Sequence, residues 1–339
     1  MQDDLNREFS QMATVLNFNN LRCIAAPDLK TDMDLSTEEI QSLLKISLDI
    51  KREPHKYSRS LSGRSVVLLF EKPSLRTRLT FELAVRQMGG NSIFSEGRIG
   101  AREPLQDVAR NMEGWVNAIV ARTFDQSTID RLAEYASIPV INALSDLYHP
   151  CQALADMFSL QEYFRRLRGI RLAFVGDGNN VAHSLMLCAA RLGVNFALAT
   201  PAGYKPDPGI VEIAQECASA SGAEIKVTED PVEAVTDADA VYTDVWASMG
   251  QEDEAVERRR YFVPYQVNAA LMRRAKPKAA FMHCLPAKRG QEVTDDVMES
   301  RQSIVFAQAE NRLYVEQALL MMMIGDQADS RHEENERPR

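Results

Sequence analysis

The feature of this sequence that most constrains the fold is an alternation of short apolar runs with longer segments of helical pattern. The runs with the length and β-branched composition of strands are SVVLLF (65–70), AIVART (118–123), IRLAFVGD (170–177), FALAT (196–200), EIKVT (224–228), AVYTDVW (240–246), AAFMHCL (279–285) and SIVFAQ (303–308). Helical patterns lie between them, for example at 75–89, 104–116 and 150–167. Strands that alternate with helices predict mainly parallel sheets flanked by helices, which is an α/β fold.

The length of 339 residues suggests two domains, since a domain has roughly 150 residues. We predict a first domain over 1–150 and a second over 151–325, joined by interdomain helices. The apolar helix expected at 311–324 either closes the second domain or packs back on the first, and the sequence leaves both arrangements open. The charged segment 326–339 is predicted to be a disordered tail.

Composition narrows the class of protein. The 39 Lys and Arg against 48 Asp and Glu give a net charge of −9, which argues against nucleic-acid and membrane-surface binding but leaves room for a local arginine cluster. The five cysteines are odd in number and form no CxxC pair, so a zinc site or disulfide framework is not expected. The acidic N-terminus lacks signal-peptide features, and no run of 18 apolar residues occurs. We therefore expect a cytoplasmic protein without a metal ion.

The strongest local motif is FEKPSLRTR at 70–78. A buried strand ends at Phe70, and a helix is expected to begin near Ser74. The start of a helix offers free N–H groups and the positive end of the helix dipole. Arg76 and Arg78 add guanidinium groups that match the geometry of a phosphate. A capped helix with two surface arginines is the simpler alternative, but it is less usual directly after a buried strand.

Further polar residues follow other strands. Arg122 ends an apolar strand, at the edge where open α/β sheets bind ligands, although a salt-bridged arginine is equally expected there. In DLYHPCQALAD, Pro150 suits the first turn of a helix, which puts His149 just outside the helix and Gln152 on its first turn. His149 could donate to a carbonyl oxygen and Gln152 could contact an amide, but alone the segment favours a capping or packed histidine.

The loop GDGNN at 176–180 resembles part of a dinucleotide-binding loop. Val181 replaces the third glycine of G-x-G-x-x-G, and no acidic residue ends the next strand, so NAD is not the expected cofactor. Asn179 and Asn180 would instead face a ligand with polar side chains, or simply form a turn.

The segment TDVWASMGQE follows another apolar strand. Asp244 at the end of this strand could pair with an ammonium group. Ser248, Met249 and Gly250 would form a mobile or tightly turned loop. A plain surface loop is the alternative.

In MHCLPAKRG, Cys284 and Leu285 lie where a strand meets Pro286. A thiolate nucleophile paired with His283 is not expected, because neighbouring residues on a strand point to opposite faces. A binding role for Cys284, through its sulfur and the nearby carbonyl groups, is favoured. In ENR, Arg312 is placed at the start of the closing helix.

Together these segments resemble the aspartate/ornithine carbamoyltransferase superfamily, and the ornithine carbamoyltransferases in particular. The matching pieces, in the family's order between about residue 20 and about residue 325, are SLRTR, ART, HPCQ, GDGNN, DVWASMGQE, HCLPAKRG and ENR. Each piece is weak alone, but all of them in register are specific. The resemblance implies two α/β domains, a homotrimer, no cofactor, and transfer of the carbamoyl group of carbamoyl phosphate to the side-chain amine of L-ornithine. The products would be L-citrulline and phosphate, as in arginine metabolism.

The resemblance also implies the roles of individual residues. Carbamoyl phosphate would be bound by Ser74, Leu75, Arg76, Thr77, Arg122, His149, Gln152, the carbonyl groups of Cys284 and Leu285, and Arg312. Ornithine would be bound by Asn180, Asp244, Ser248 and Met249. The catalytic residues would be Arg122, His149 and Cys284. Arg122 and His149, with Thr77, would stabilise the charge that grows on the carbonyl oxygen.

Three positions depart from the family pattern. Leu75 replaces a Thr found in many members, and only its backbone is expected to matter. Lys288 stands where His is frequent. Arg98 stands where a Gln or His is often contributed to a neighbouring subunit's site, and we assign it no role.

Other functions remain open from the sequence. A different amine acceptor, such as putrescine or N-acylated ornithine, is the nearest alternative, whereas aspartate would need cationic groups for its second carboxylate. A non-catalytic paralogue would be expected to lack ligand-binding residues, but Arg76, Arg122 and Arg312 are present. The sequence does not distinguish arginine synthesis from arginine breakdown.

Overall fold

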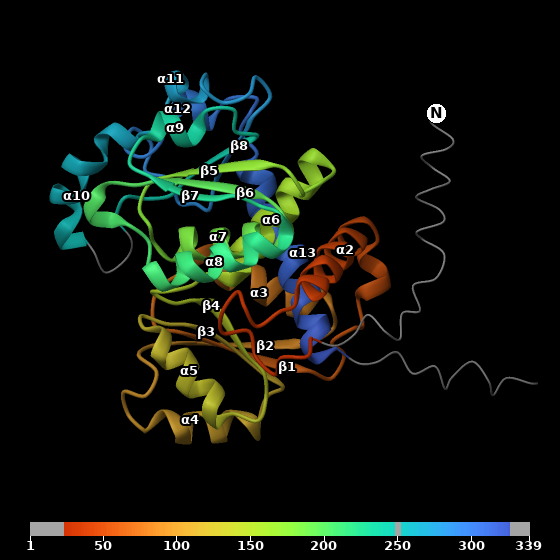
Figure 1. Ribbon diagram of the computed structural model, residues 1–339. Helices are drawn as coiled ribbons and strands as arrows, with labels where there is room; N and C mark the ends of the chain where they lie inside the picture. Colours follow the sequence, from red (N-terminus) through yellow and green to blue (C-terminus); the bar gives the residue numbers. More distant parts are fainter. Residues whose placement is uncertain (1–23, 248–251, 326–339) are drawn as a thin grey trace, which may run out of the picture.

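The computed structural model describes residues 24–247 and 252–325, which form two β-sheets, one in each half of Figure 1. The first sheet has the strand order β2-β1-β3-β4, and the second has the order β7-β6-β5-β8-β9. All pairings within them are parallel. The strands are β1 (Ser65–Phe70), β2 (Asn91–Glu96), β3 (Ala118–Arg122), β4 (Val140–Leu144), β5 (Arg171–Val175), β6 (Asn195–Ala199), β7 (Ile225–Thr228), β8 (Ala240–Thr243) and β9 (Ala280–His283). The predicted α/β fold with two parallel-sheet domains is confirmed.

Helices cover the faces of both sheets. In Figure 1, α4 and α5 lie below the lower sheet, α7 and α8 lie below the upper sheet, and α9, α11 and α12 lie above it. The helices are α2 (Thr37–Arg52), α3 (Leu75–Gln87), α4 (Leu105–Glu113), α5 (Gln126–Tyr135), α6 (Pro150–Phe164), α7 (Asn180–Leu192), α8 (Pro208–Ser221), α9 (Pro231–Val235), α10 (Ala255–Phe262), α11 (Ala269–Met272), α12 (Asp295–Met298) and α13 (Val305–Ile324), with 3₁₀ turns η2 (Pro54–Tyr57), η3 (Ala202–Tyr204), η4 (Glu252–Glu254) and η5 (Val263–Tyr265).

The central strands are apolar along their whole length because both faces of each sheet are covered. Every residue of β3 is buried, and so are all but the first of β1. The packed core therefore fixes the carboxyl ends of these strands. The residues that follow them, such as Ser74, are attached to a rigid part of the fold.

Local signals account for the helix starts. Ser36 and Glu39 form a capping box before α2, and Pro150 occupies the first turn of α6. The Asn179 side chain accepts hydrogen bonds from the N–H groups of Val181 and Ala182 at the start of α7. These contacts satisfy N–H groups that have no partner inside the helix.

The apolar runs do not predict β2 and β4, which are the two edges of the first sheet. Most residues of β2 are exposed, so its sequence NSIFSE carries few apolar residues. β4 is interrupted by Asn142, whose side chain donates a hydrogen bond to the Lys30 carbonyl group at 2.8 Å. The exposure of β2 explains its weak pattern, whereas β4 is buried and its apolar run is broken by a polar side chain.

The predicted strand at 303–308 is wrong. Only a short bridge forms, in which the N–H of Ile304 donates to the Phe281 carbonyl group at 3.0 Å. Helix α13 then begins at Val305 and buries Val305, Gln308 and Arg312, which recur at helical spacing. Arg312 therefore lies inside α13 and not at its start, which corrects the prediction.

Helix α13 packs against α2, α3 and α6 and touches β9 (Figure 1). The last helix thus returns to the first half of the chain and crosses between the two sheets. The division of the chain at residue 150 stays a prediction, since α6 begins at that residue and contacts both α2 and α7.

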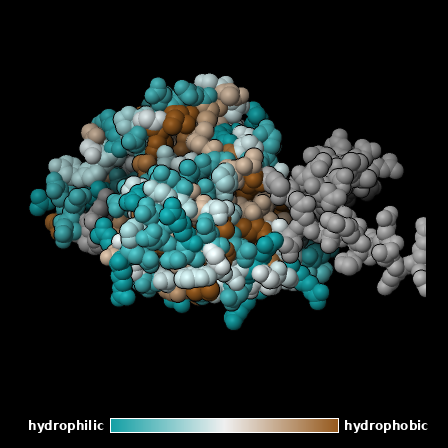
Figure 2. Space-filling model, turned by 90° about the horizontal axis from the view of Figure 1, so that it is seen from below, coloured by the Kyte–Doolittle hydropathy of each residue, from teal (hydrophilic) through white to brown (hydrophobic). Residues whose placement is uncertain are grey.

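The surface seen from below is mostly hydrophilic, with separate hydrophobic patches (Figure 2). Among the exposed apolar side chains, Leu75, Leu79 and Leu83 recur every fourth residue along α3 and so share one face of this helix. No helix within the described ranges is both long enough and apolar enough to cross a membrane.

The Gly178→Ala substitution tests why the loop after β5 contains glycine. A Cβ atom at Gly178 would lie 2.3 Å from the backbone nitrogen of Pro206, so the two loops would have to separate. We expect a loss of about 1–3 kcal/mol in the free energy of unfolding, measured by chemical denaturation. Gly203→Ala is the control, because a Cβ there meets no atom within 4 Å. Equal stability of the two variants would contradict the packing role of Gly178.

Candidate active site

Residues singled out in the sequence gather where the carboxyl ends of strands from both sheets face each other. β1 leads to Ser74 and β3 ends at Arg122 in the first sheet. β8 leads to Asp244 and β9 leads to Cys284 in the second. In parallel sheets this edge is where ligands bind.

Three arginines from separate elements meet in this region. Burial, Arg312 and Arg76 lower the pKa of Arg122 to about 10, while burial and Arg312 lower the pKa of Arg76. Burial is the larger cause of both shifts, and the neighbouring guanidinium groups add to it as like charges. Arg122 is 7% exposed, and its Nε has no hydrogen-bond partner among the described residues. The cluster therefore has a strong attraction for an anion.

Arg312 is held in one orientation by side chains from three helices. Its Nη2 donates to the Thr77 hydroxyl at 2.9 Å, and its Nη1 donates to the Gln152 Oε1 at 3.2 Å. The Glu316 carboxylate accepts from the same Nη2 at 3.0 Å, one helical turn further along α13. This guanidinium is preorganised, because all the groups that fix it are themselves buried.

A buried carboxyl group connects α6 to α13 and to the second sheet. Asp156 accepts hydrogen bonds from Gln152 Nε2 at 2.8 Å, from Gln308 Nε2 at 2.6 Å and from the Tyr242 hydroxyl at 3.1 Å. Burial raises the pKa of Asp156 to about 7 despite these donors. Gln308 also accepts from the N–H of His283 at 3.0 Å, so the network reaches from α6 to β8, α13 and β9.

His149 precedes α6, as predicted, and is 5% exposed. Its N–H donates to the Ser184 hydroxyl at 2.8 Å, whereas its Nδ1 has no partner among the described residues. Burial, followed by the charges of Arg312 and Arg122, holds the pKa of His149 well below its usual range. The ring is therefore neutral at physiological pH and can donate a single hydrogen bond without carrying charge.

Asp244 lies between two side chains on the second sheet. The Cys284 thiol donates to its Oδ1 at 3.0 Å, and Asn179 Nδ2 donates to its Oδ2 at 3.0 Å. Burial and the neighbouring Asp244 raise the pKa of the Cys284 thiol well above its usual range. Cys284 is therefore a neutral thiol, which suits binding and disfavours nucleophilic attack.

The other predicted ornithine-binding residues have different outcomes. Asn180 Nδ2 donates to the Ser145 carbonyl group at 2.7 Å and so links the second sheet to the loop after β4. Ser248 and Met249 lie outside the described residues. Asn179, for which a simple turn was an equal alternative, is the asparagine that contacts Asp244.

The start of α3 presents the residues predicted to bind a phosphate. The Ser74 side chain does not cap the helix, although Ser74 has the extended backbone of an N-cap residue. Leu75 is 72% exposed, so its side chain lies on the surface. The N–H groups of this first turn lie beside Arg76 and Thr77 and add the positive end of the helix to the site.

Asp244, His283 and Cys284 each place one potential metal ligand atom within 4.8 Å of the others. His283 Nδ1 accepts the N–H of Leu285 at 2.8 Å, so its Nε2 carries the proton and faces Glu292 at 3.2 Å. This histidine has no free nitrogen for a cation. The backbone of Leu285 has a φ of 58°, an uncommon conformation for leucine that turns the carbonyl groups after β9.

Sequence reasoning missed several polar residues of this region. Lys72 is 8% exposed, with its Nζ 4.5 Å from the centre of the Phe124 ring, and burial and Arg122 lower its pKa. Its place directly after β1 was a usable signal. Asp156 lies one helical turn after Gln152, and Glu316 lies one turn after Arg312. This i, i+4 spacing could have indicated both acidic residues from the sequence.

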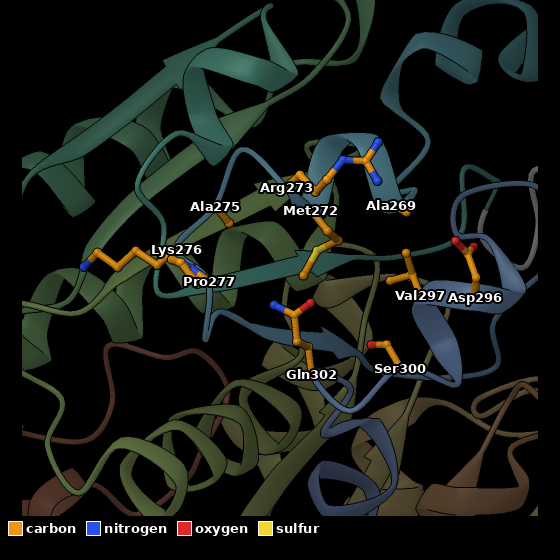
Figure 3. Close-up of a pocket in the computed structure, with 10 residues that line it drawn as sticks. All are labelled: Ala269, Met272, Arg273, Ala275, Lys276, Pro277, Asp296, Val297, Ser300 and Gln302. Carbon is orange, nitrogen blue, oxygen red and sulfur yellow. The ribbon is translucent and has the colours of Figure 1, made fainter.

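A separate cavity of about 340 Å³ lies between α11, α12 and the segment before β9 (Figure 3). It is lined by Met272, Arg273, Val297, Ser300 and Gln302, among others. None of the predicted site residues lines it, and it adjoins the amino end of β9, on the opposite edge of the sheet from Cys284.

Comparison with known families identifies the chain. Residues 28–162 match the model described as aspartate/ornithine carbamoyltransferase, carbamoyl-P binding domain. Residues 168–323 match the model described as aspartate/ornithine carbamoyltransferase, Asp/Orn binding domain. The chain belongs to the aspartate/ornithine carbamoyltransferase family. The two matched regions each contain one of the two parallel sheets.

Individual members of this family are similar over nearly their whole length. The ornithine carbamoyltransferase of Thermococcus kodakarensis is 47% identical over 307 residues, which are 89% of this chain and 98% of that protein. The solved structure of the Pyrococcus furiosus ornithine carbamoyltransferase has a TM-score of 0.87 at 45% identity, covering 89% of this chain and 98% of that one. The Giardia lamblia ornithine transcarbamoylase has a TM-score of 0.82 at 31% identity, covering 89% and 99%.

Alkylation tests the neutral state of the Cys284 thiol. At pH 7.5 we expect iodoacetamide to modify Cys284 at least about tenfold more slowly than in urea-denatured protein, because the thiolate is the reactive form. Mass spectrometry of the peptides gives the rate for each cysteine, and Cys217, which is half-buried on α8, provides the reference. Rapid modification of native Cys284 would restore the nucleophile hypothesis.

Proposed function

We propose that this chain transfers the carbamoyl group of carbamoyl phosphate to the side-chain amine of L-ornithine, forming L-citrulline and phosphate. The observation that carries this proposal is the cluster of the buried Arg122 and Arg312 with the half-buried Arg76, which adjoins a second group of polar residues around Asp244. The similarity to proteins named ornithine carbamoyltransferase supports the same substrates.

The first group of residues suits carbamoyl phosphate. In the proposal, Ser74, Leu75 and Arg76 bind the phosphate through the helix start, together with Thr77, Arg122 and Arg312. His149 and Arg122 donate to the carbonyl oxygen. Gln152 and the carbonyl groups of Cys284 and Leu285 bind the amide end. Two buried polar atoms, Arg122 Nε and His149 Nδ1, support this proposal because they have no hydrogen-bond partner among the described residues. A bound ligand would offset the cost of their desolvation.

The proposed mechanism is direct attack of an amine on a carbonyl carbon. The ornithine Nδ has an ordinary pKa of about 10.4, by analogy with lysine, and desolvation in the site lowers it so that the neutral amine is available. The N–C bond forms and the C–O bond to phosphate breaks, and the proton that the nitrogen loses is taken up by the leaving phosphate. Arg122, Thr77 and neutral His149 stabilise the charge on the carbonyl oxygen, and phosphate leaves against the arginines.

The second group of residues suits a free amino acid. Asp244 accepts from neutral donors, which are Cys284, Asn179 and the N–H of Val245, so its charge is available to the α-ammonium group of ornithine. Asn180, Ser248 and Met249 complete the proposed ornithine site. Putrescine lacks the carboxylate and N-acylated ornithine lacks the free ammonium, so neither would use all of these residues.

We also propose that the chain forms a homotrimer in the cytoplasm. The exposed leucines of α3, Leu75, Leu79 and Leu83, begin beside Ser74, so a second copy packed on them would adjoin the phosphate site. The described cysteines are all free thiols, which agrees with a reducing compartment. Within one subunit, residues 1–150 would bind carbamoyl phosphate and residues 151–325 would bind ornithine.

A colorimetric citrulline assay tests the function. We expect the purified chain to form citrulline from carbamoyl phosphate and ornithine, with far lower rates for putrescine or N-acetylornithine. Arg122→Ala should lower kcat by about 10²–10³-fold, the usual effect of removing an oxyanion donor, without changing the melting temperature. Arg131→Ala, on the exposed side of α5, is the control. A folded Arg122→Ala variant with unchanged kcat would exclude the proposed role.

The Asp244→Asn substitution tests the acceptor site. The variant keeps the shape of the side chain but removes its charge, so ornithine should bind about tenfold more weakly or worse. Binding of carbamoyl phosphate should change little. Isothermal titration calorimetry with each ligand measures both effects, and equal losses for the two ligands would contradict the assignment.

A further inference from the structure

The arginine cluster contains an acidic residue that the proposed mechanism does not use. Glu316 is completely buried, and its Oε1 faces Arg312 Nη2 at 3.0 Å and Arg312 Nε at 3.4 Å. Its Oε2 is also buried and has no hydrogen-bond partner among the described residues. Half of this carboxyl group therefore binds Arg312, and the other half is unsatisfied.

The groups around Glu316 come from three helices. Arg312 lies on α13 itself, Thr80 faces the carboxylate from α3, and Cys151 faces it from α6. Thr80 already donates its hydroxyl to the Arg76 carbonyl group at 2.9 Å. Among the described groups that shift the pKa of Glu316, the one cation is Arg312, a residue that also contacts Thr77 and Gln152.

We propose that Glu316 is a positioning residue that sets the anion affinity of the site, because it fixes Arg312 and, when ionised, offsets part of the positive charge of the cluster. This inference rests on the proposed binding of carbamoyl phosphate at Arg122 and Arg312. The phosphate group and the Glu316 carboxylate then compete for the same guanidinium.

The competition depends on the ionisation of Glu316. Burial raises the pKa of Glu316 to about 7, and Arg312 and Thr80 oppose part of this rise. Below pH 7 the carboxyl group is neutral and does not oppose an anion, whereas above pH 7 its charge weakens anion binding. An anion bound beside Arg312 favours the neutral form further, so binding should be accompanied by proton uptake.

Two variants separate the charge of Glu316 from its contact with Arg312. Glu316→Gln keeps an oxygen that accepts from Arg312 but removes the charge. Glu316→Ala removes both. Sulfate is a suitable probe because its charge does not change between pH 5.5 and pH 8.5, and calorimetry gives its Kd.

At pH 8.5 we expect Glu316→Gln to bind sulfate about fivefold to tenfold more tightly than the wild type, an effect of the size typical of coupled sites. At pH 5.5 the two proteins should bind equally. Glu316→Ala should bind more weakly than Glu316→Gln at both values, since Arg312 loses its anchor. The proposal would be overturned if Glu316→Gln bound sulfate no more tightly than the wild type at pH 8.5. It would also be overturned if the gain in affinity were the same factor at both pH values.

Wild-type protein provides a test that needs no Glu316 variant. Calorimetry at pH 7.5 in two buffers of different ionisation enthalpy should reveal proton uptake with sulfate, and absence of uptake would also overturn the proposal. The Arg122→Ala variant distinguishes an error in the anion site from an error in the role of Glu316. If sulfate binds this variant as it binds the wild type, the anion site itself is misplaced. If Arg122→Ala loses binding while Glu316→Gln behaves as the wild type, only the role of Glu316 is wrong.

Discussion

The close approach of Arg76, Arg122 and Arg312 inside the protein is the interaction on which the site depends. Burial removes water from each guanidinium, and like charges at short range repel one another, so the arrangement is unfavourable alone. The lowered pKa of Arg122, about 10, expresses this cost. The same cost favours any anion that enters, because an anion reduces the repulsion and replaces the lost water.

The surrounding fold prevents the cluster from relaxing. Arg122 ends a strand with every residue buried, and Arg312 is anchored to Thr77, Gln152 and Glu316. These anchors come from α3, α6 and α13, which pack against one another. Positively charged side chains on loops would turn outwards to solvent, whereas here helix packing fixes them. The site is thus preorganised by the same contacts that join the two sheets.

Two buried carboxyl groups that were not among the predicted site residues hold the side chains of the site in place. Burial raises the pKa of Asp156 and of Glu316 to about 7. Asp156 arranges neutral amides, including Gln152, whereas Glu316 contacts a cation directly. The carboxyl group that contacts the Arg312 guanidinium can therefore lose its negative charge close to physiological pH.

The sequence was sufficient for the central strands because a run such as SVVLLF is explained only by burial on both faces. It failed for β2, which is mostly exposed, and for β4, in which the polar Asn142 breaks a short buried run. It also failed at 303–308, where an apolar run supports a helix, since a short buried segment fits either structure. Gln308, read there as part of a strand, instead joins Asp156 to the backbone of His283.

The sequence by itself determined the alternation of strands and helices, and it determined which chemical groups follow each strand, because those are local properties of the chain. It therefore supplied Arg76, Arg122, His149, Asp244 and Cys284 as candidates. Only the tertiary structure decided that the last helix returns to helices α2, α3 and α6 and places Arg312 against Thr77, 235 positions earlier. Such contacts depend on packing between distant segments, which no local pattern records. The neutral state of the His149 ring has the same origin, since burial and two arginines from other elements produce it.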